Sequence, residues 1–403
     1  MTTLVFAERL VTCDAARKAP LDALGVLERA VIAIEQGRIV DVGGASERPH
    51  ESDALVLDAP LVTPGLVDAH THAAWVGSRH VEYALRLQGA DYEAIAQAGG
   101  GIVSSMRSVR TAKSDDIARE LDARVRRMAR LGVTTVEVKS GYGLDLESEV
   151  KQLSAIDAVS RRPGVPSLVA TYLALHALPP EANGDRDAYA ANVAAHGLAE
   201  VAAQAPFRFV DAYIDRSAFS VAQARPVLEK ARALGFGIRL HVGQFADVGG
   251  AELAAELSAA SVDHLEQVSE AGIAKLAAAG VRAVLLPVAS FTLGQAPPPV
   301  ALLRARGVKL VVASDANPGT APTESLPLAL AFAVKSYGLT VEEAILGATR
   351  EAALSLGLGD RGVVQSGARA DLVLWDLPHE AAIMQPFGVA KTRHVMIAGA
   401  LIS

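Results

Sequence analysis

The chain has 403 residues, which is long enough for one large barrel domain with a smaller companion domain, or for two to three ordinary domains. Hydrophobic residues make up 51% and charged residues 21%, a balance that excludes a disordered chain, and the net charge of -7 without any long Lys/Arg run argues against a nucleic-acid-binding protein. The single cysteine, Cys13, excludes an internal disulfide framework and a cysteine-rich zinc site, so any metal must be bound by His, Asp or Glu.

The start of the chain shows no basic segment followed by a long apolar core, and no stretch reaches the roughly 18 uninterrupted apolar residues of a membrane span. We therefore expect a cytoplasmic protein with no membrane contact. Residues 1–60 read as short strands, because apolar alternation runs through LVFAERLVT and VIAIEQGRIVDVG, with Gly37 and Gly43 at turns.

The middle of the chain, residues 61–359, alternates buried β-type runs with Ala/Leu-rich helical patterns such as DDIARELDARVRRMARLG and ESEVKQLSAIDAVS. The strand candidates are GLVDAHTH, VTTVEVKS, SLVATYLALH, RFVDAYID, GIRLHVG, ASVDHLE, RAVLLPVA and VKLVVASDA. Eight buried strands, each followed by a helix, predict an α/β protein with a parallel (β/α)8 TIM-type barrel. A doubly wound open sheet is the alternative, but no glycine-rich phosphate fingerprint follows the first strand.

The end of the chain, residues 360–403, returns to short strands in GARADLVLWDL and HVMIAGALI. We expect residues 1–60 and 360–403 to pair into a small β-sandwich domain that flanks the barrel of residues 61–359.

Polar residues gather at the predicted C-terminal ends of the barrel strands, where parallel barrels hold their active sites. Lys139 and Tyr142 follow the second strand. Five of the ten histidines and one aspartate end other strands: His70, His72, His176, His241, His264 and Asp315. We expect these side chains on one rim of the barrel.

A metal site is indicated by four of these residues. His70 and His72 are two apart on a strand, so both side chains point to the same face. Together with His241 and Asp315 they offer nitrogen and oxygen ligands that suit zinc or iron and leave a position for water. A bound metal polarises an amide carbonyl and lowers the pKa of its water. Asp315 can also take the proton of that water, and His264 can polarise the carbonyl or stabilise an oxyanion.

The stretch LVTPGLVDAHTH, followed downstream by a strand-end histidine, a DH pair and an SD pair, resembles the amidohydrolase superfamily. GARADLVLWDL is similar to the returning β-sandwich strands of that superfamily. Narrower segments resemble the imidazolonepropionase family in the same order along the chain: HTHAAWVGSRHVEYALRLQGADYEAIAQAGGGI, EVKSGYGLD, LALHALPPE and ASDANPGTAP.

This resemblance implies hydrolytic opening of 4-imidazolone-5-propanoate to N-formimidoyl-L-glutamate in histidine degradation, with one zinc or iron ion as cofactor. It implies His70, His72, His241 and Asp315 as metal ligands and His264 as a catalytic residue. It also suggests a homodimer. The implied contacts to substrate or ring-opened product come from Arg79, Tyr142, His176, Asn317, Gly319 and Thr320. Arg79 suits the propionate, because a guanidinium fork matches a carboxylate.

Two positions depart from related patterns. Gln244 stands in HVGQ where related ring deaminases often have a glutamate, and a carboxamide cannot shuttle a proton. Gln244 can still hydrogen-bond the substrate ring, so proton transfer is expected to fall to Asp315 and His264. Lys139 raises the alternative of a carbamylated lysine between two metals, although its context VKSGYG resembles the single-metal family.

Two competing functions remain from the sequence. A purine- or pyrimidine-ring deaminase of the same superfamily is disfavoured by Gln244 and by the Arg79 loop. A binding barrel that has lost turnover is disfavoured because all four candidate ligands and His264 are present.

Overall fold

The computed structural model describes residues 2–17, 22–44, 54–90, 100–387, 389 and 391–402. Residues 91–99, which include the start of the glycine-rich AGGGI segment, lie outside the described residues, as do short parts of both predicted end regions. Within the described part of the chain, no helix combines the length and apolar character needed to cross a membrane.

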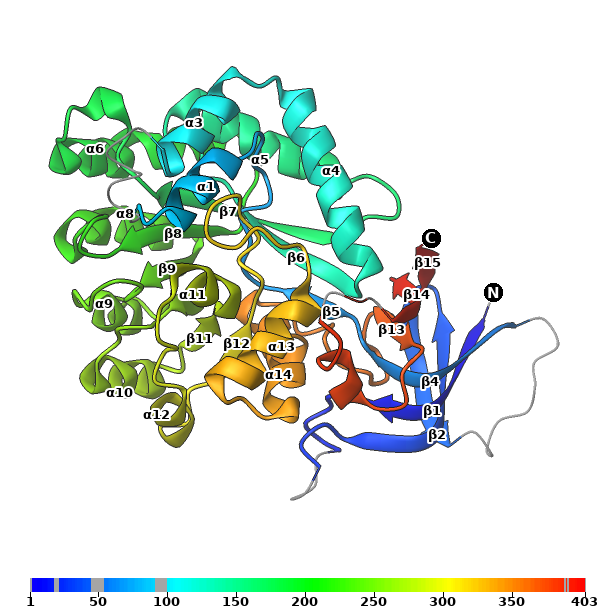
Figure 1. Cartoon of the computed structure of the whole chain (residues 1–403). Helices are drawn as coiled ribbons and strands as arrows, with labels where there is room; N and C mark the ends of the chain where they lie inside the picture. The colour runs from blue at the N-terminus through cyan, green and yellow to red at the C-terminus, as the bar shows by residue number, and fades with distance from the viewer. Residues whose placement is uncertain are drawn as a thin grey trace.

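An eight-stranded parallel sheet forms the centre of the larger body (Figure 1). Its strands follow one another in sequence order around a barrel, as the sequence predicts. They are β5 (Leu66–Asp68), β6 (Val133–Lys139), β7 (Ser167–Leu175), β8 (Phe209–Ile214), β9 (Gly237–Val242), β10 (Ser261–His264), β11 (Arg282–Leu285) and β12 (Leu310–Val312).

The barrel closes just beyond the ends of its first and last strands. The Asp315 amide donates to the His70 carbonyl at 3.1 Å, and the His72 amide donates to the Ala316 carbonyl at 3.0 Å. These two hydrogen bonds run between segments that carry candidate metal ligands. Closure of the barrel therefore brings the HxH pair and Asp315 together.

Helices cover the outside of the barrel (Figure 1). Their apolar faces pack on strands that are almost wholly buried, which explains the continuous apolar runs of the sequence. The helices are α1 (His80–Leu87), α3 (Ile102–Thr111), α4 (Ser114–Arg130), α5 (Leu146–Ser160), α6 (Arg186–Asn192), α7 (Leu198–Gln204), α8 (Val221–Ala233), α9 (Gly250–Glu256), α10 (Glu270–Ala279), α11 (Pro287–Leu293), α12 (Val300–Ala305), α13 (Leu326–Tyr337), α14 (Val341–Gly347) and α15 (Arg350–Ser355). Three shorter helical segments are also present among the described residues: η2 (Pro180–Ala182), the π-helical η3 (Val193–Gly197) and η4 (Glu380–Ile383).

Both ends of the chain form one seven-stranded mixed sheet beside the barrel, with the two termini close together (Figure 1). The central pairing is parallel between β1 and β4, and antiparallel between β4 and β13. The strands are β1 (Thr3–Val11), β2 (Val26–Glu35), β3 (Arg38–Gly44), β4 (Leu55–Pro64), β13 (Leu372–Trp375), β14 (Thr392–Ile397) and β15 (Ala400–Ile402).

The sheet and the barrel share one hydrophobic core. Trp375 of β13 is buried, and its indole N–H donates to the Thr63 hydroxyl at 2.9 Å. Its ring packs against Gly132, where a Cβ would lie 3.0 Å from the indole. The flanking sheet is therefore packed firmly against the base of β6.

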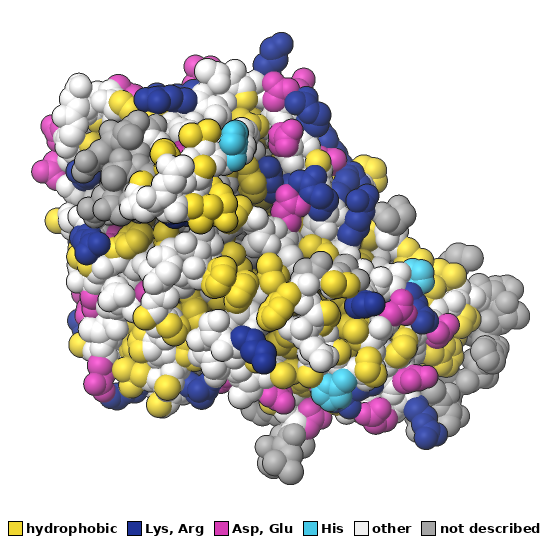
Figure 2. Space-filling model, in the orientation of Figure 1, with side chains coloured by type: hydrophobic (Ala, Val, Ile, Leu, Met, Phe, Trp, Pro, Cys, Tyr) yellow, Lys and Arg dark blue, Asp and Glu magenta, His cyan; other side chains and the backbone are white. Residues whose placement is uncertain are grey.

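Charged side chains on the face seen in Figure 2 are mixed in sign. Lys and Arg gather over α4, with Asp and Glu among them. The mixture of acidic and basic side chains reflects the α4 sequence SDDIARELDARVRRMAR.

Candidate active site

Three histidines and one aspartate meet at the mouth of the barrel. Donor atoms of His70, His72 and His241 all lie within 4.8 Å of one another. His70 Nε2 and His72 Nε2 are 3.4 and 3.6 Å from the same Asp315 oxygen. All four side chains are buried. The arrangement can hold one metal ion, because the imidazole nitrogens and the carboxylate converge on one point.

Buried carboxylates orient two of these histidines from behind. Asp263 lies 2.7 Å from His70 Nδ1, and Asp211 lies 3.1 Å from His241 Nδ1. Each carboxylate accepts a hydrogen bond from the Nδ1–H group of its histidine. The proton therefore stays on Nδ1, and Nε2 is left as the ligand atom. Burial lowers the pKa of His70 well below its ordinary value, with Lys139 adding to the effect. A neutral imidazole is the form that binds a metal.

Lys139 lies under the site as an ammonium ion. Its Nζ is 2.8 Å from both Glu137 and Asp211, and 3.6 Å from Asp263. Although burial lowers the pKa of Lys139, Asp211 and Glu137 raise it above its ordinary value. Carbamylation requires a neutral amine, so this environment opposes the two-metal alternative.

A second buried cation completes this layer. Arg239 is fully buried, donates to the Ala69 carbonyl at 2.7 Å, and lies 3.7 Å from both Glu137 and Asp263. Two cations thus offset three carboxylates beneath the candidate ligands. Such compensation is what allows ionised groups to stay buried.

Backbone strain is concentrated where the polar side chains enter the pocket. His264, Leu265 and Asp315 have φ angles of 82°, 75° and 56°, in the left-handed region that side chains rarely adopt. Strained residues of this kind often mark functional sites, where the surrounding structure offsets the cost. Asp68 holds the last turn in place, because its carboxylate accepts from the Ser314 amide and hydroxyl.

His264 faces the same pocket, and Glu266 stands behind it. The Glu266 carboxylate is 3.7 Å from His264 Nδ1, and both facing atoms lack a hydrogen bond in the described structure. Ser290 donates to the other Glu266 oxygen at 2.5 Å, and the Tyr337 hydroxyl is 2.5 Å from Ser290 Oγ. Burial lowers the pKa of His264, but Glu266 raises it above its ordinary value. His264 is therefore suited to carry a proton.

One pocket, with a volume of about 40 Å³, joins ten of the residues selected from the sequence. Ile102 and Tyr213 complete its lining. The ten are His72, Arg79, Tyr142, His176, Gln244, His241, His264, Asp315, Asn317 and Thr320. His70 lies buried beneath the pocket, and Gly319 lies behind Arg79.

Arg79 is buried beside Gly319, and part of its guanidinium is available to bind a ligand. Its Nε is 3.1 Å from Glu82, but its Nη2 is buried without a hydrogen-bond partner among the described residues. A Cβ on Gly319 would lie 2.0 Å from Arg79 Nη1, so only glycine leaves room for the guanidinium. The Asn317 side chain fixes this turn by accepting from the Gly319 and Thr320 amides and donating to the Asp315 carbonyl.

Tyr142 and His176 form an aromatic wall beside His72. The His72 and His176 rings are stacked with centroids 5.2 Å apart, and Tyr142 lies 5.3 Å from His176. His176 Nδ1 donates to the Gly141 carbonyl at 2.7 Å, and burial lowers its pKa to about 3. His176 therefore stays neutral with Nε2 free as an acceptor.

Several residues of this site escaped the sequence analysis. These are Asp211 and Tyr213, which are two apart on β8, and Glu137, which is two residues before the already named Lys139 on β6; strand periodicity places each pair on one inward face. This period-two pattern could have identified these residues from the sequence. The Glu266 network was harder to find, because Ser290 and Tyr337 come from distant helices.

Gln244 lies in the pocket with its oxygen already engaged. The Tyr213 hydroxyl donates to Gln244 Oε1 at 2.7 Å. Because Oε1 is engaged, the side-chain amide nitrogen of Gln244 is the atom available to a ligand. Towards that ligand Gln244 therefore acts as a hydrogen-bond donor.

Comparisons with known proteins find relatives over most of the chain. A model of the amidohydrolase family matches residues 61–402. An imidazolonepropionase of Mesorhizobium japonicum is 43% identical over 371 residues, covering 91% of this chain and 90% of that protein. An imidazolonepropionase of Idiomarina loihiensis is 40% identical over 395 residues, covering 97% of both chains.

Solved structures share the fold at lower identity. The zinc-bound atrazine chlorohydrolase of Arthrobacter aurescens TC1 superposes with a TM-score of 0.76 at 17% identity, covering 99% of this chain and 94% of that one. A zinc-bound adenosine deaminase of Xanthomonas campestris superposes with a TM-score of 0.71 at 20% identity, covering 99% and 92%. At this identity the likeness concerns the fold alone.

Proposed function

The chain belongs to the amidohydrolase family and, within it, to the imidazolonepropionases, and from this premise we propose that it hydrolyses 4-imidazolone-5-propanoate to N-formimidoyl-L-glutamate in histidine degradation. The observation that carries the proposal is that one pocket contains both a candidate metal site and a candidate carboxylate-binding group. It combines the His/Asp cluster with the buried Arg79, whose Nη2 has no partner. The first suits hydrolysis of a cyclic amide and the second suits a carboxylate tail.

His70, His72, His241 and Asp315 hold one zinc or iron ion in this proposal. The fit rests on their chemistry: His70 Nε2 is buried and has no hydrogen bond within the described residues, and three nitrogens with one carboxylate oxygen suit either metal. When bound, such an ion supplies Lewis acidity and makes water acidic enough to attack near neutral pH.

Proton transfer is assigned to Asp315 and His264. Asp315 accepts the proton of the attacking water, and burial, opposed by His264, raises the pKa of its carboxyl to about 7. His264 donates a hydrogen bond to the carbonyl oxygen as negative charge develops there. The water oxygen becomes part of the new carboxylate, the ring C–N bond breaks, and the leaving nitrogen takes up the proton. Gln244 takes no part in proton transfer.

Substrate binding is assigned to the walls of the pocket. Arg79 pairs with the propionate, and Gly319 leaves room for that pair. Tyr142, His176 and the Gln244 amide contact the ring or tail through hydrogen bonds. Asn317 and Thr320 hold the turn that faces the ring-opened product. We further propose a cytoplasmic homodimer with no nucleic-acid or membrane partner.

The first experiment follows the ultraviolet absorbance of freshly prepared 4-imidazolone-5-propanoate with the metal-replete protein. We expect loss of absorbance with formation of N-formimidoyl-L-glutamate, and we expect a chelator to stop it. Metal analysis of the active protein distinguishes zinc from iron. A metal-loaded protein that leaves this compound intact but deaminates a purine or pyrimidine ring would overturn the proposed substrate.

His70→Ala tests the metal assignment. Because the substitution removes one of four ligands, we expect metal retention and activity to fall together, each by at least about ten-fold. Metal content is measured by atomic absorption after dialysis. A variant with normal metal content would remove His70 from the ligand set.

A further inference from the structure

The segment that follows β9 carries Gln244 into the candidate pocket on a backbone that is held on both sides. The Gln295 side-chain amide donates to the Gln244 carbonyl at 2.8 Å. The next backbone amide, that of Phe245, donates to the Asp215 carboxylate at 2.9 Å. The main chain at Gln244 is therefore fixed, and the orientation of its side-chain amide is the freedom that remains.

A carboxamide can present either of its two ends to a ligand. Its oxygen accepts hydrogen bonds and its nitrogen donates them, and the two ends have nearly the same shape. Rotation about the last side-chain bond would exchange them, so Gln244 could meet either a donor or an acceptor of a bound ring. The pocket is selective at this position only if a group outside the substrate fixes the amide.

Tyr213 supplies that constraint. Its hydroxyl donates to Gln244 Oε1 at 2.7 Å, and both side chains are buried and line the candidate pocket. A phenol is a better donor than acceptor, because a lone pair of its oxygen is delocalised into the ring. The reversed amide would therefore exchange a good hydrogen bond for a weaker one. Loss of the hydroxyl would leave the buried Oε1 short of a partner.

The position of Tyr213 on β8 lets one strand serve two neighbours. Asp211 and Tyr213 are two apart and share the inward face of β8, which pairs in parallel with β9. Asp211 lies 3.1 Å from His241 Nδ1. The Tyr213 ring lies beside the His241 ring, with centroids 5.8 Å apart, and its hydroxyl reaches Gln244. The strand thus orients a candidate metal ligand and, separately, a substrate contact.

We propose that Tyr213 is a specificity-determining residue, which acts by fixing Gln244 with its Nε2 toward the substrate. The pocket then favours a ring whose facing edge carries a hydrogen-bond acceptor, either a carbonyl oxygen or an imine nitrogen. It disfavours a ring that presents an N–H or amino group there. This inference rests on the proposed function, since 4-imidazolone-5-propanoate carries both kinds of acceptor. Tyr213 itself is a positioning residue, because it acts through Gln244.

The test is a double-mutant cycle in KM, with 4-imidazolone-5-propanoate as the substrate. Tyr213→Phe removes only the hydroxyl and allows the amide to reverse, so we expect KM to rise about five-fold with kcat nearly unchanged. Gln244→Met keeps the length of the side chain but removes the donor and the acceptor, so KM should rise at least about ten-fold. In the Gln244→Met background, Tyr213→Phe should add less than about two-fold, because its effect passes through the lost amide.

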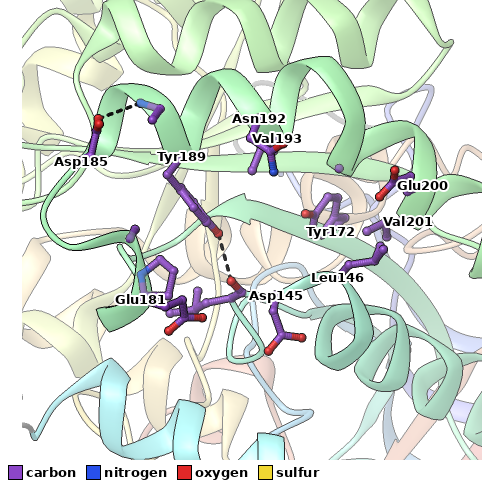
Figure 3. Close-up of a pocket in the computed structure, with 15 residues that line it drawn as sticks. Asp145, Leu146, Tyr172, Glu181, Asp185, Tyr189, Asn192, Val193, Glu200 and Val201 are labelled. Carbon is purple, nitrogen blue, oxygen red and sulfur yellow. Dashed lines mark hydrogen bonds between the residues drawn. The ribbon is translucent and has the colours of Figure 1, made fainter.

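Tyr189→Phe is the matched control. The Tyr189 hydroxyl also donates to an acceptor, the Leu144 carbonyl at 3.5 Å, but it lies in a separate cavity lined by α5, α6 and α7 (Figure 3). We expect the KM of this variant to equal that of the original protein. Thermal melts check that each variant is folded, and metal content checks that the neighbouring His241 is undisturbed.

An unchanged KM in Tyr213→Phe would overturn the inference. So would an equal rise with and without Gln244→Met, since Tyr213 would then act independently of the amide. A normal KM in Gln244→Met would remove Gln244 from the substrate contacts and overturn it as well. Each of these results requires turnover by the original protein and leaves the proposed function intact. If the original protein does not consume 4-imidazolone-5-propanoate at all, the proposed substrate and this inference fall together.

Discussion

At the scale of single residues, the site shows how burial and pairing set the state of each ionisable group. Asp263 and Asp211 lie on the Nδ1 side of His70 and His241, while Lys139 balances the carboxylates from below. Although burial raises the pKa of Asp211, the neighbouring His241 and the Lys139 ammonium lower it below its ordinary value. The carboxylate stays ionised, and the ligand nitrogen stays directed at the metal position.

Gly319→Ala tests whether the position of the Arg79 guanidinium matters for substrate binding. The added Cβ would lie 2.0 Å from Arg79 Nη1, so the guanidinium must move out of its position. Because charged hydrogen bonds to the propionate are lost, we expect KM to rise about ten-fold or more, as with Arg79→Ala, while metal content is unchanged. Steady-state kinetics measure the effect.

The control for this substitution is Gly359→Ala, since a Cβ there meets nothing within 4 Å. Its KM should equal that of the original protein. An unchanged KM in both Gly319→Ala and Arg79→Ala would reject the assignment of Arg79 to the carboxylate.

Glu266→Gln tests the group behind His264. The substitution keeps the shape but removes the negative charge that faces His264 Nδ1 at 3.7 Å. We expect kcat to fall by about 10- to 100-fold, because the imidazole loses both its orientation and its charge stabilisation. KM and metal content should change little. Tyr337→Phe, which is further along the same network, should show a smaller loss. If kcat were retained in Glu266→Gln, the carboxylate would have no positioning role.

At the scale of elements, the loop after β6 is held by the helix that follows it. The Glu149 carboxylate of α5 accepts from the amides of Gly141, Gly143 and Leu144, each at 2.8 Å. Gln152 accepts from the Tyr142 amide at 3.1 Å and donates to the Ala74 carbonyl. The short SGYG loop is thereby fixed, and Tyr142 reaches the pocket from a rigid support.

Glu149→Gln should loosen that loop. A carboxamide nitrogen cannot accept hydrogen bonds, so at least one loop amide loses its partner. We expect a loss of about 1 to 3 kcal/mol in the free energy of unfolding, together with a several-fold rise in KM. Urea denaturation and kinetics measure the two effects. The exposed neighbour Glu147→Gln serves as the matched control on the same helix. Equal behaviour of the two variants would contradict the clamp.

At the scale of the whole molecule, the two ends of the chain are tied together by a partly buried ion pair. Arg9 of β1 contacts Glu380 of η4 through two hydrogen bonds of 2.7 and 2.8 Å. Although burial raises the pKa of Glu380, Arg9 lowers it below the ordinary value of 4.5. A depressed pKa means that this group stabilises the fold above pH 4.5 and that its contribution is lost as the pH falls through the lower, folded-state value.

Glu380→Gln should therefore cost about 1 to 3 kcal/mol near pH 7, and this difference should shrink as the pH falls below about 4.5. Denaturant unfolding across a pH series measures it. Glu28→Gln is the control, because Glu28 contacts the same Arg9 but is 66% exposed, and such surface pairs contribute little. A deficit for Glu380→Gln that persisted unchanged at acid pH would show that the ion pair is not its cause.

Much of this architecture could be read from local sequence pattern. Each of the eight candidate runs contains a barrel strand, and both end regions contribute to one sheet. Period-two alternation and apolar runs mark buried strands directly, because they reflect which faces meet the core. His70 and His72 could be placed on one inward face for the same reason.

The remaining features depend on contacts between segments far apart in the chain. The sequence by itself determined the barrel, the flanking strands and the residue types at the rim, since these follow from periodicity and from motif. Only the tertiary structure decided that Lys139 pairs with Asp211, that Glu266 lies behind His264, and that Gly319 leaves room for Arg79. Such pairings arise because barrel closure and helix packing bring distant side chains together, and no local pattern encodes which of them will meet.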